Sequence, residues 1–290
     1  MPLPRGLPIV DHHCHLSPNG EGVEAARRFR AAGGSHLFLT TQNYTASVPR
    51  SVEDYRKQFE TTEQLGQRVQ EETGVRVYDV VAPYPVDLVH AIPALGSETA
   101  VAVHRAALDL AGTWVREGRA LAIGEVGRAH FPVSAEVGDL VEEAFRHAFE
   151  VARDVGCPMV VHSEDLDAAG YHGIAELARR AGVPPEHVVK HYARSQVPPP
   201  AREGIVPSYL AQRDLTRQAM GEPGPWFLET DFLDDPARPG AVLDLATVPR
   251  RARTITEGSP DGGERLLIPF VESVEKVYGV RPERPERDSV

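Results

Sequence analysis

The sequence of 290 residues is poor in cysteine and has no long apolar run. Its two cysteines, Cys14 and Cys157, are too few for the disulfide framework that holds small secreted domains together. Apolar stretches such as Ala120–Ile123 and Pro158–Val161 are far too short to span a bilayer. The first residues contain no apolar segment typical of a secretory signal. We therefore expect a soluble cytoplasmic protein without a membrane partner.

Basic residues are also in deficit. The chain has 31 Lys and Arg against 42 Asp and Glu, which gives a formal net charge of -11. A protein whose main affinity comes from neutralising phosphates carries a basic face. We therefore expect no extended nucleic-acid surface, so that any nucleic acid must be held at a local site. The Gly-rich nucleotide fingerprint is likewise missing after the first apolar run.

Short apolar runs alternate along the chain with longer amphipathic stretches. Each run is mostly aliphatic and is bounded by Gly, Pro or polar residues, as is typical of buried parallel strands. The runs are Leu7–Val10, His36–Thr40, Val75–Val81, Leu121–Ile123, Pro158–Val161, His187–Val189, Gly204–Val206 and Trp226–Leu228. The stretches between them predict helices over Gly22–Ala32, Ser51–Thr73, Thr99–Glu117, Val137–Val155, Ile174–Ala181 and Tyr209–Met220.

This alternation predicts an α/β fold. One strand and helix per about 32 residues is the size of a βαβ module, and eight such modules form a closed (β/α)8 TIM barrel. An open, doubly wound sheet is the alternative, but the missing nucleotide fingerprint disfavours it. We predict one TIM-barrel domain over residues 1–280 and a flexible tail over 281–290.

Ligand-type side chains follow the predicted strands. In a TIM barrel, functional side chains gather at the C-terminal ends of the strands. His13 and His15 end the first strand and point to the same side because strand side chains alternate, whereas Cys14 points to the other side. Glu125 stands between two glycines, which leave room for a metal or a substrate to approach closely. The fifth, sixth and eighth strands are followed by His162, His191 and Asp231.

Each of these residues alone has an ordinary structural explanation as a strand-end or core-edge side chain. Their convergence at one end of a barrel is the stronger signal, because imidazoles and carboxylates so placed are neutralised and used by metal cations. The donor set suits Zn, Mn, Co or Ni, and Mg less well. The sequence therefore predicts a metal centre.

The motifs resemble those of the TatD-type metal-dependent hydrolases (TatD-related deoxyribonucleases) in the amidohydrolase superfamily. The matching segments are Asp11-His12-His13-Cys14-His15-Leu16, Ile123-Gly124-Glu125-Val126-Gly127, Val161-His162-Ser163, Lys190-His191 and Glu229-Thr230-Asp231. The resemblance implies a hydrolase with two divalent ions, one held by His13, His15 and Asp231 and the other by His162 and His191, with Glu125 bridging them.

The chain departs from the family pattern beside these motifs, at Arg128-Ala129, at Glu164 and at Tyr192-Ala193-Arg194. The metal ligands match the family pattern, whereas the positions that face a substrate do not. This supports a hydrolase and weakens the specific expectation of deoxyribonuclease activity. Two ions that share a water would supply a hydroxide nucleophile. Asp231 would act as general base and then acid, and Glu125 belongs with it to the catalytic set.

Several cationic side chains follow the ligand-bearing strands. Arg128, His130, Arg194 and Arg238 could bind a phosphoester, or they could simply pair with acidic residues. We predict hydrolysis of a small-molecule or DNA-end phosphoester ahead of the alternative, an amidase or lactonase that acts on a small carbonyl substrate. A non-catalytic protein that keeps its metal for stability is a further alternative. Residues 41–54 are interpreted either as a lid or as a plain surface loop.

Overall fold

The structure is a computed structural model that describes residues 7–45, 47–194 and 197–283. Its strands are β1 Val10–His15, β2 His36–Thr40, β3 Arg76–Val81, β4 Ala122–Gly127, β5 Met159–His162, β6 Val188–Ala193, β7 Val206–Leu210, β8 Phe227–Glu229 and β9 Phe232–Leu233. Its α-helices are α1 Val23–Ala32, α2 Val52–Thr73, α3 Pro85–Leu95, α4 Ser97–Arg116, α5 Ala135–Val155, α6 Ala168–Ala181, α7 Arg213–Ala219, α8 Thr247–Gly258, α9 Gly262–Arg265 and α10 Ser273–Tyr278. Among the residues described, no helix is both long and apolar enough to cross a membrane.

The strands form a parallel sheet in the order β8-β7-β6-β5-β4-β3-β2-β1-β9. Typical registers pair Val10 with His36 between β1 and β2 and Gly124 with Val160 between β4 and β5. The backbone N–H of Asp231 donates to the carbonyl of His13, so the chain that leaves β8 runs along β1. The order and the alternation with helices are those of a TIM-barrel-type α/β fold, as predicted.

Contacts divide the chain into two compact units. Unit 1 comprises the residues up to Leu39, Gln64–Tyr78 and the residues from Pro207 on, and unit 2 comprises Thr40–Glu63 and Asp79–Val206. The prediction of a flexible tail stays untested, because residues 284–290 lie outside the described part.

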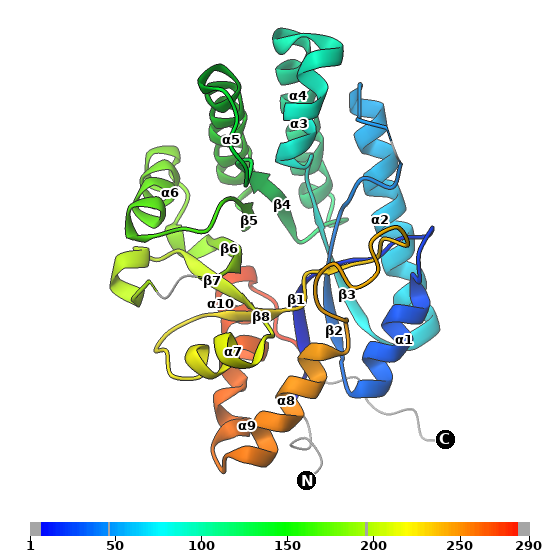
Figure 1. The fold of residues 1–290 in the computed structure, drawn as a ribbon, viewed down its shortest axis with the longest axis vertical. Helices are drawn as coiled ribbons and strands as arrows, with labels where there is room; N and C mark the ends of the chain where they lie inside the picture. Colours follow the sequence, from blue (N-terminus) through cyan, green and yellow to red (C-terminus); the bar gives the residue numbers. More distant parts are fainter. Residues whose placement is uncertain (1–6, 46, 195–196, 284–290) are drawn as a thin grey trace. The chain divides into compact units, whose positions relative to one another are not determined.

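In unit 2, helices α4 and α5 pack on each other and on β4 (Figure 1). Helix α5 begins where the Ser134 hydroxyl accepts a bond from the Val137 N–H, and it ends at Gly156, whose left-handed backbone closes the last turn. Its buried face places Phe145 and Phe149 in the core. Burial of each such side chain stabilises the fold by roughly 1.5–3 kcal/mol.

In unit 1, helix α1 packs beside β1 and β2. Phe29 on the helix and Leu37 and Leu39 on β2 form one buried cluster that also takes in Cys14. Cys14 is therefore a core residue, as its alternation along the strand predicts. Burial raises the pKa of its thiol well above the usual value.

Several predicted bounds are wrong. The run Leu7–Val10 shares only Val10 with β1, and the run Gly204–Val206 shares only Val206 with β7. The amphipathic pattern predicts a helix from Tyr209, yet Tyr209 and Leu210 end β7 and helix α7 begins only at Arg213. Helix α3, over Pro85–Leu95, was not predicted. Its prolines at the first position and at 93 resemble a loop composition, whereas a proline at the first turn of a helix costs no hydrogen bond.

Candidate metal centre

The six predicted ligands lie at the C-terminal ends of their strands, as the fold requires. His15 ends β1 and His162 ends β5, whereas Glu125 and His191 lie in the second halves of β4 and β6. Asp231 follows β8 by two residues. The structure brings them together as two triads, one in each unit.

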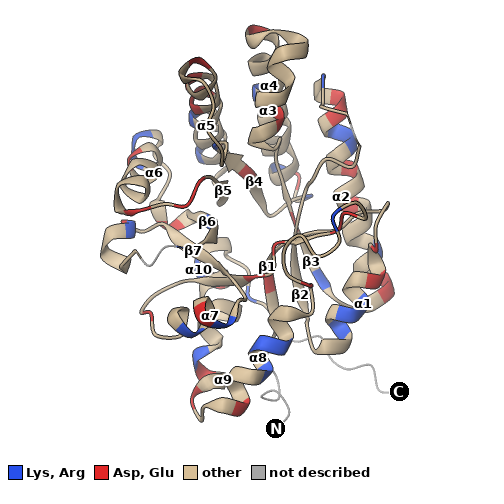
Figure 2. Ribbon diagram, viewed as in Figure 1, with Lys and Arg blue, Asp and Glu red and all other residues tan. Residues whose placement is uncertain are grey.

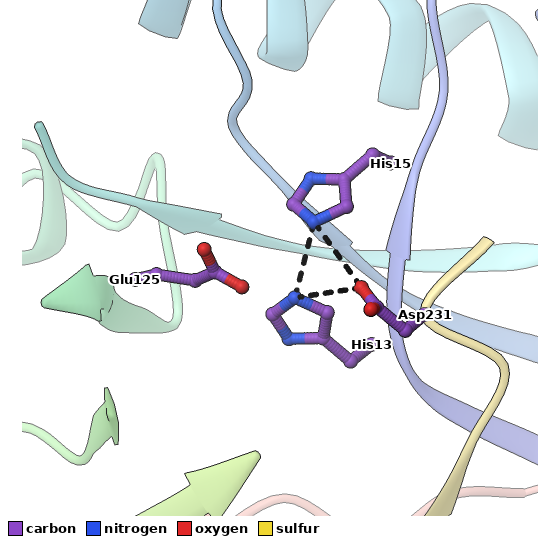
Figure 3. A group of neighbouring side chains, drawn as sticks. All are labelled: His13, His15, Glu125 and Asp231. Carbon is purple, nitrogen blue, oxygen red and sulfur yellow. Dashed lines mark hydrogen bonds and ion pairs between the residues drawn. The ribbon is translucent and has the colours of Figure 1, made fainter. Parts of the chain in front are cut away.

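The unit 1 triad consists of His13, His15 and Asp231 (Figure 3). The Nε2 atoms of the two histidines are 3.2 Å apart, and Asp231 Oδ1 lies 3.9 Å from His13 Nε2 and 3.6 Å from His15 Nε2. Both histidines are buried. Three ligand atoms thus face a common point, which confirms that the side chains of His13 and His15 lie on the same side of the strand.

Asp231 owes its position to an unusual backbone conformation. Its φ is 48°, in the left-handed region that few residues other than glycine adopt, although Asp tolerates it better than most. Thr230 beside it donates through its hydroxyl and its N–H to the carboxylate of Asp11, at 2.6 and 3.0 Å. Burial raises the pKa of Asp11 to about 8. The first Asp of the motif thus ties β1 to the turn that carries Asp231.

The unit 2 triad consists of Glu125, His162 and His191, whose ligand atoms all lie within 4.8 Å of one another. His191 Nε2 is 2.9 Å from Glu125 Oε1, and His162 Nδ1 is 3.5 Å from Glu125 Oε2 and 3.2 Å from His191 Nε2. Burial lowers the pKa of His162, against the raising effect of Glu125. A neutral imidazole is the form that binds a metal.

The glycines on either side of Glu125 lie close against strand β5. A Cβ on Gly124 would lie 2.7 Å from the Cβ of Val160, and one on Gly127 would lie 2.1 Å from the carbonyl oxygen of His162. Both glycines therefore allow strand β5 to approach β4 closely. That they also leave room for a metal or a substrate stays a prediction.

The cationic candidates differ in what they contact. Arg128 donates to Glu142 at 2.8 and 3.2 Å, and Arg238 donates to Asp235 at 2.8 Å. The exposed Arg194 lies over the ring of Tyr192, 4.3 Å from its centroid. His130 contacts a predicted ligand instead, with its Nδ1 2.9 Å from Nε2 of His162.

Two residues near the unit 2 triad were missed as site residues by the reasoning from sequence. The hydroxyl of Tyr84 lies 3.2 Å from His162 Nε2. The ammonium of Lys190, which is 1% exposed, donates to the carbonyl oxygens of His191 at 2.7 Å and Ser163 at 3.3 Å. The position of Lys190 directly after the apolar pair Val188–Val189 is a sequence feature that could have indicated a buried charge near the site. Tyr84, beside Pro85, has no such feature.

The spacing within each triad fits a divalent cation. Metal–nitrogen and metal–oxygen bonds of about 2.0–2.2 Å in a tetrahedral arrangement separate neighbouring ligand atoms by roughly 3.4 Å. The donor atoms above lie 2.9 to 3.9 Å apart. Imidazole and carboxylate ligands are those of Zn, Mn, Co and Ni sites. The donor set is therefore suited to divalent metal.

The fold and the two triads define a class: an α/β protein of the TIM-barrel type with clusters of His, Glu and Asp side chains at its strand ends. A sequence model of the family described as TatD related DNase matches residues 10–279. The chain belongs to the TatD related DNase family. The resemblance inferred from the motifs is thus confirmed.

The chain is also similar to individual proteins. An uncharacterized protein of Methanocaldococcus jannaschii is 31% identical over 289 residues, which cover 96% of this chain and 98% of that protein. The crystal structure of a TatD-like protein from Archaeoglobus fulgidus matches with a TM-score of 0.64 at 14% identity, covering 93% of this chain and 100% of that one. A TatD homologue from Escherichia coli matches with a TM-score of 0.62 at 16% identity, covering 94% and 98%. At these identities the solved structures show a shared fold.

Proposed function

We propose that the protein is a metal-dependent hydrolase in which the two triads serve one centre of two divalent ions. His13, His15 and Asp231 would hold one ion, His162 and His191 would hold the other, and Glu125 would be shared. The observation that carries the proposal is the pair of triads, each with buried nitrogen and oxygen ligands at metal-like spacing. Membership of the TatD related DNase family supports it.

Bound divalent ions lower the pKa of water towards neutrality and polarise the oxygen of the bond that is cleaved. Asp231 is the residue we assign to proton transfer, because its side chain is 16% exposed and is the most accessible carboxylate of the two triads. It would take the proton of the attacking water and deliver it to the leaving group. The more deeply buried Glu125 would orient the ligands.

We favour a phosphoester as the substrate, with DNA ends as one candidate. The family description supports this choice, and the exposed Arg194 is available to a phosphate. A long polyanion is disfavoured, because the segment from β5 to α6, drawn red in Figure 2, carries Glu164, Asp165 and Asp167. A small phosphodiester or a strand end meets less of this repulsion than a duplex does.

The proposal is tested with a panel of substrates and one pair of variants. Protein loaded with Zn or Mn is assayed on a bis-aryl phosphate, a single-stranded oligonucleotide and a set of lactones. We expect phosphodiester cleavage, reduced on the order of 10²–10⁴-fold in Asp231→Asn because general acid–base catalysis contributes that much. Asp235→Asn, on the same segment and paired with Arg238, is the control and keeps full activity.

Two results would contradict the proposal. Rapid lactone opening without phosphodiester cleavage would favour the carbonyl hydrolase instead. Full activity of the Asp231→Asn variant would refute the role of that carboxylate. Circular dichroism and metal analysis of both variants show whether any loss reflects unfolding or loss of the ions.

A further inference from the structure

The two ring nitrogens of His162 face different groups. Nδ1 is directed into the unit 2 triad, 3.2 Å from His191 Nε2 and 3.5 Å from Glu125 Oε2. Nε2 is directed out of the triad, 2.9 Å from His130 Nδ1 and 3.2 Å from the hydroxyl of Tyr84. Because a neutral imidazole carries its hydrogen on only one nitrogen, the partners of Nε2 decide whether Nδ1 has a lone pair for a metal.

Tyr84 and His130 come from separate loops of unit 2. Tyr84 caps the N-terminus of α3, and His130 lies in the loop between β4 and α5. Both rings meet His162 edge to face, with centroids 5.0 Å away at interplanar angles of 77° and 72°. Phe131 packs edge to face on His130 in turn, at 5.2 Å. The outward edge of His162 is thus held by aromatic rings as well as by polar atoms.

We propose that Tyr84 and His130 are positioning residues that keep the hydrogen of His162 on Nε2 and so present Nδ1 to a metal. The N–H of Nε2 donates to Nδ1 of His130, and the Tyr84 oxygen is the second acceptor. The inference rests on the proposed metal centre and deepens it. It gives His130 a role through His162, in place of the direct substrate contact predicted from the sequence.

The opposite tautomer would defeat the site. With its hydrogen on Nδ1, His162 would direct an N–H bond at His191 and Glu125, at the point where an ion has to bind. Its Nε2 would then need a donor, either the Tyr84 hydroxyl or a His130 that carries its own hydrogen on Nδ1. The pairing that leaves a lone pair for a metal is the one in which Nδ1 of His130 accepts, and this is the pairing that we assign.

The test separates the loss of the hydrogen-bond acceptor at position 130 from the loss of the imidazole ring. His130→Leu removes the acceptor, His130→Asn keeps an oxygen close to the place of Nδ1, and Tyr84→Phe removes the hydroxyl alone. The double variant Tyr84→Phe/His130→Leu covers the case in which either acceptor suffices. His172→Leu is the control, because His172 is an exposed histidine of unit 2 that pairs with Glu203.

The measurement is the affinity of the full-length protein for Zn, by competition with a chromophoric chelator. In the double variant we expect one of two bound Zn ions to be held about 10–100-fold more weakly, the usual effect of removing a partner of a ligating histidine. The other ion keeps its affinity, and His130→Asn stays close to the wild type. In the Zn-loaded wild type, we expect ¹⁵N–¹H correlation spectra to show the hydrogen of His162 on Nε2.

Unchanged affinity in the double variant would overturn the inference, and so would a His162 hydrogen on Nδ1. Equal losses in His130→Asn and His130→Leu would show that the ring matters for packing and not as an acceptor. A wild-type protein that binds no Zn at all would refute the proposed metal centre itself. Failure of the metal centre can be distinguished from failure of the further inference, because it is seen in the wild type before any variant is compared.

Discussion

Burial alters the proton affinity of histidines that lie outside the metal triads. Desolvation lowers the pKa of His104, on α4, to about 3, and that of His36, on β2, to about 4. Both side chains are therefore neutral in the folded protein at any physiological pH. The unfolded chain binds protons at these residues below pH 6.5, whereas the folded chain does not.

We therefore predict that stability decreases as the pH falls from about 6.5 towards 4, by about 1.4 kcal/mol per pH unit for each of these histidines. In His104→Leu we expect the slope of stability against pH to decrease by the contribution of one histidine, about 1.4 kcal/mol per pH unit. The measurement is the free energy of unfolding in urea at pH 7.5, 5.5 and 4.5. His172→Leu, at an exposed position, is the control for replacing a histidine by leucine. Parallel curves for the wild type and His104→Leu would contradict the explanation.

The predicted ligands illustrate which single residues can be found without a structure. His13 and His15 could be assigned together, because strand alternation is a local rule that needs no knowledge of the partners. Tyr84 and Lys190 could not, because their roles depend on His162 and on backbone oxygens far away in sequence. The sequence also could not show that Arg128 is held by Glu142, since the two are joined only when α5 packs beside β4.

At the scale of elements, the approach of β4 to β5 depends on Gly127. Its φ is 135°, and a Cβ there would meet the His162 carbonyl at 2.1 Å. We predict that Gly127→Ala destabilises the protein by about 3 kcal/mol or more, because the strand must shift and the backbone is strained as well. It also weakens metal binding, since His162 moves with its carbonyl.

Gly118→Ala is the matched control. Its φ of 71° carries the same kind of backbone cost, but nothing lies within 4 Å of the added Cβ. We expect a loss of roughly 1 kcal/mol in this variant and no change in metal affinity. Thermal or urea unfolding separates the two cases. Equal losses would show that close packing at β4 is not what requires a glycine at position 127.

The presence of the strands could be predicted more completely than that of the helices, although the bounds of several helices agree better. The apolar run His36–Thr40 is β2 itself, and most of the other runs overlap their strands because buried parallel strands are continuously apolar. Several of the strands extend further than predicted, since their C-terminal halves carry the polar site residues that a search for apolar runs stops at. Helix α3 carries no periodic signal, because its mostly apolar composition hides its helical face.

At the scale of the molecule, alternation of strands and helices predicted the TIM-barrel type correctly. That inference needs only the succession of elements and the rule for parallel connections. The grouping of ligands into triads required more, because it depends on which strand ends become neighbours. The family resemblance supplied that grouping in advance, and the structure reproduces each triad within its own unit.

The most direct measurement of the central claim is the number of metal ions bound by protein purified without a metal-affinity tag. After removal of metal and titration with Zn or Mn, we predict two equivalents in the wild type and one in both His13→Ala and His191→Ala. Metal at about 100 times the dissociation constant adds about 2.7 kcal/mol of stability per site. Absence of bound metal in the wild type, with unchanged thermal stability, would contradict the account.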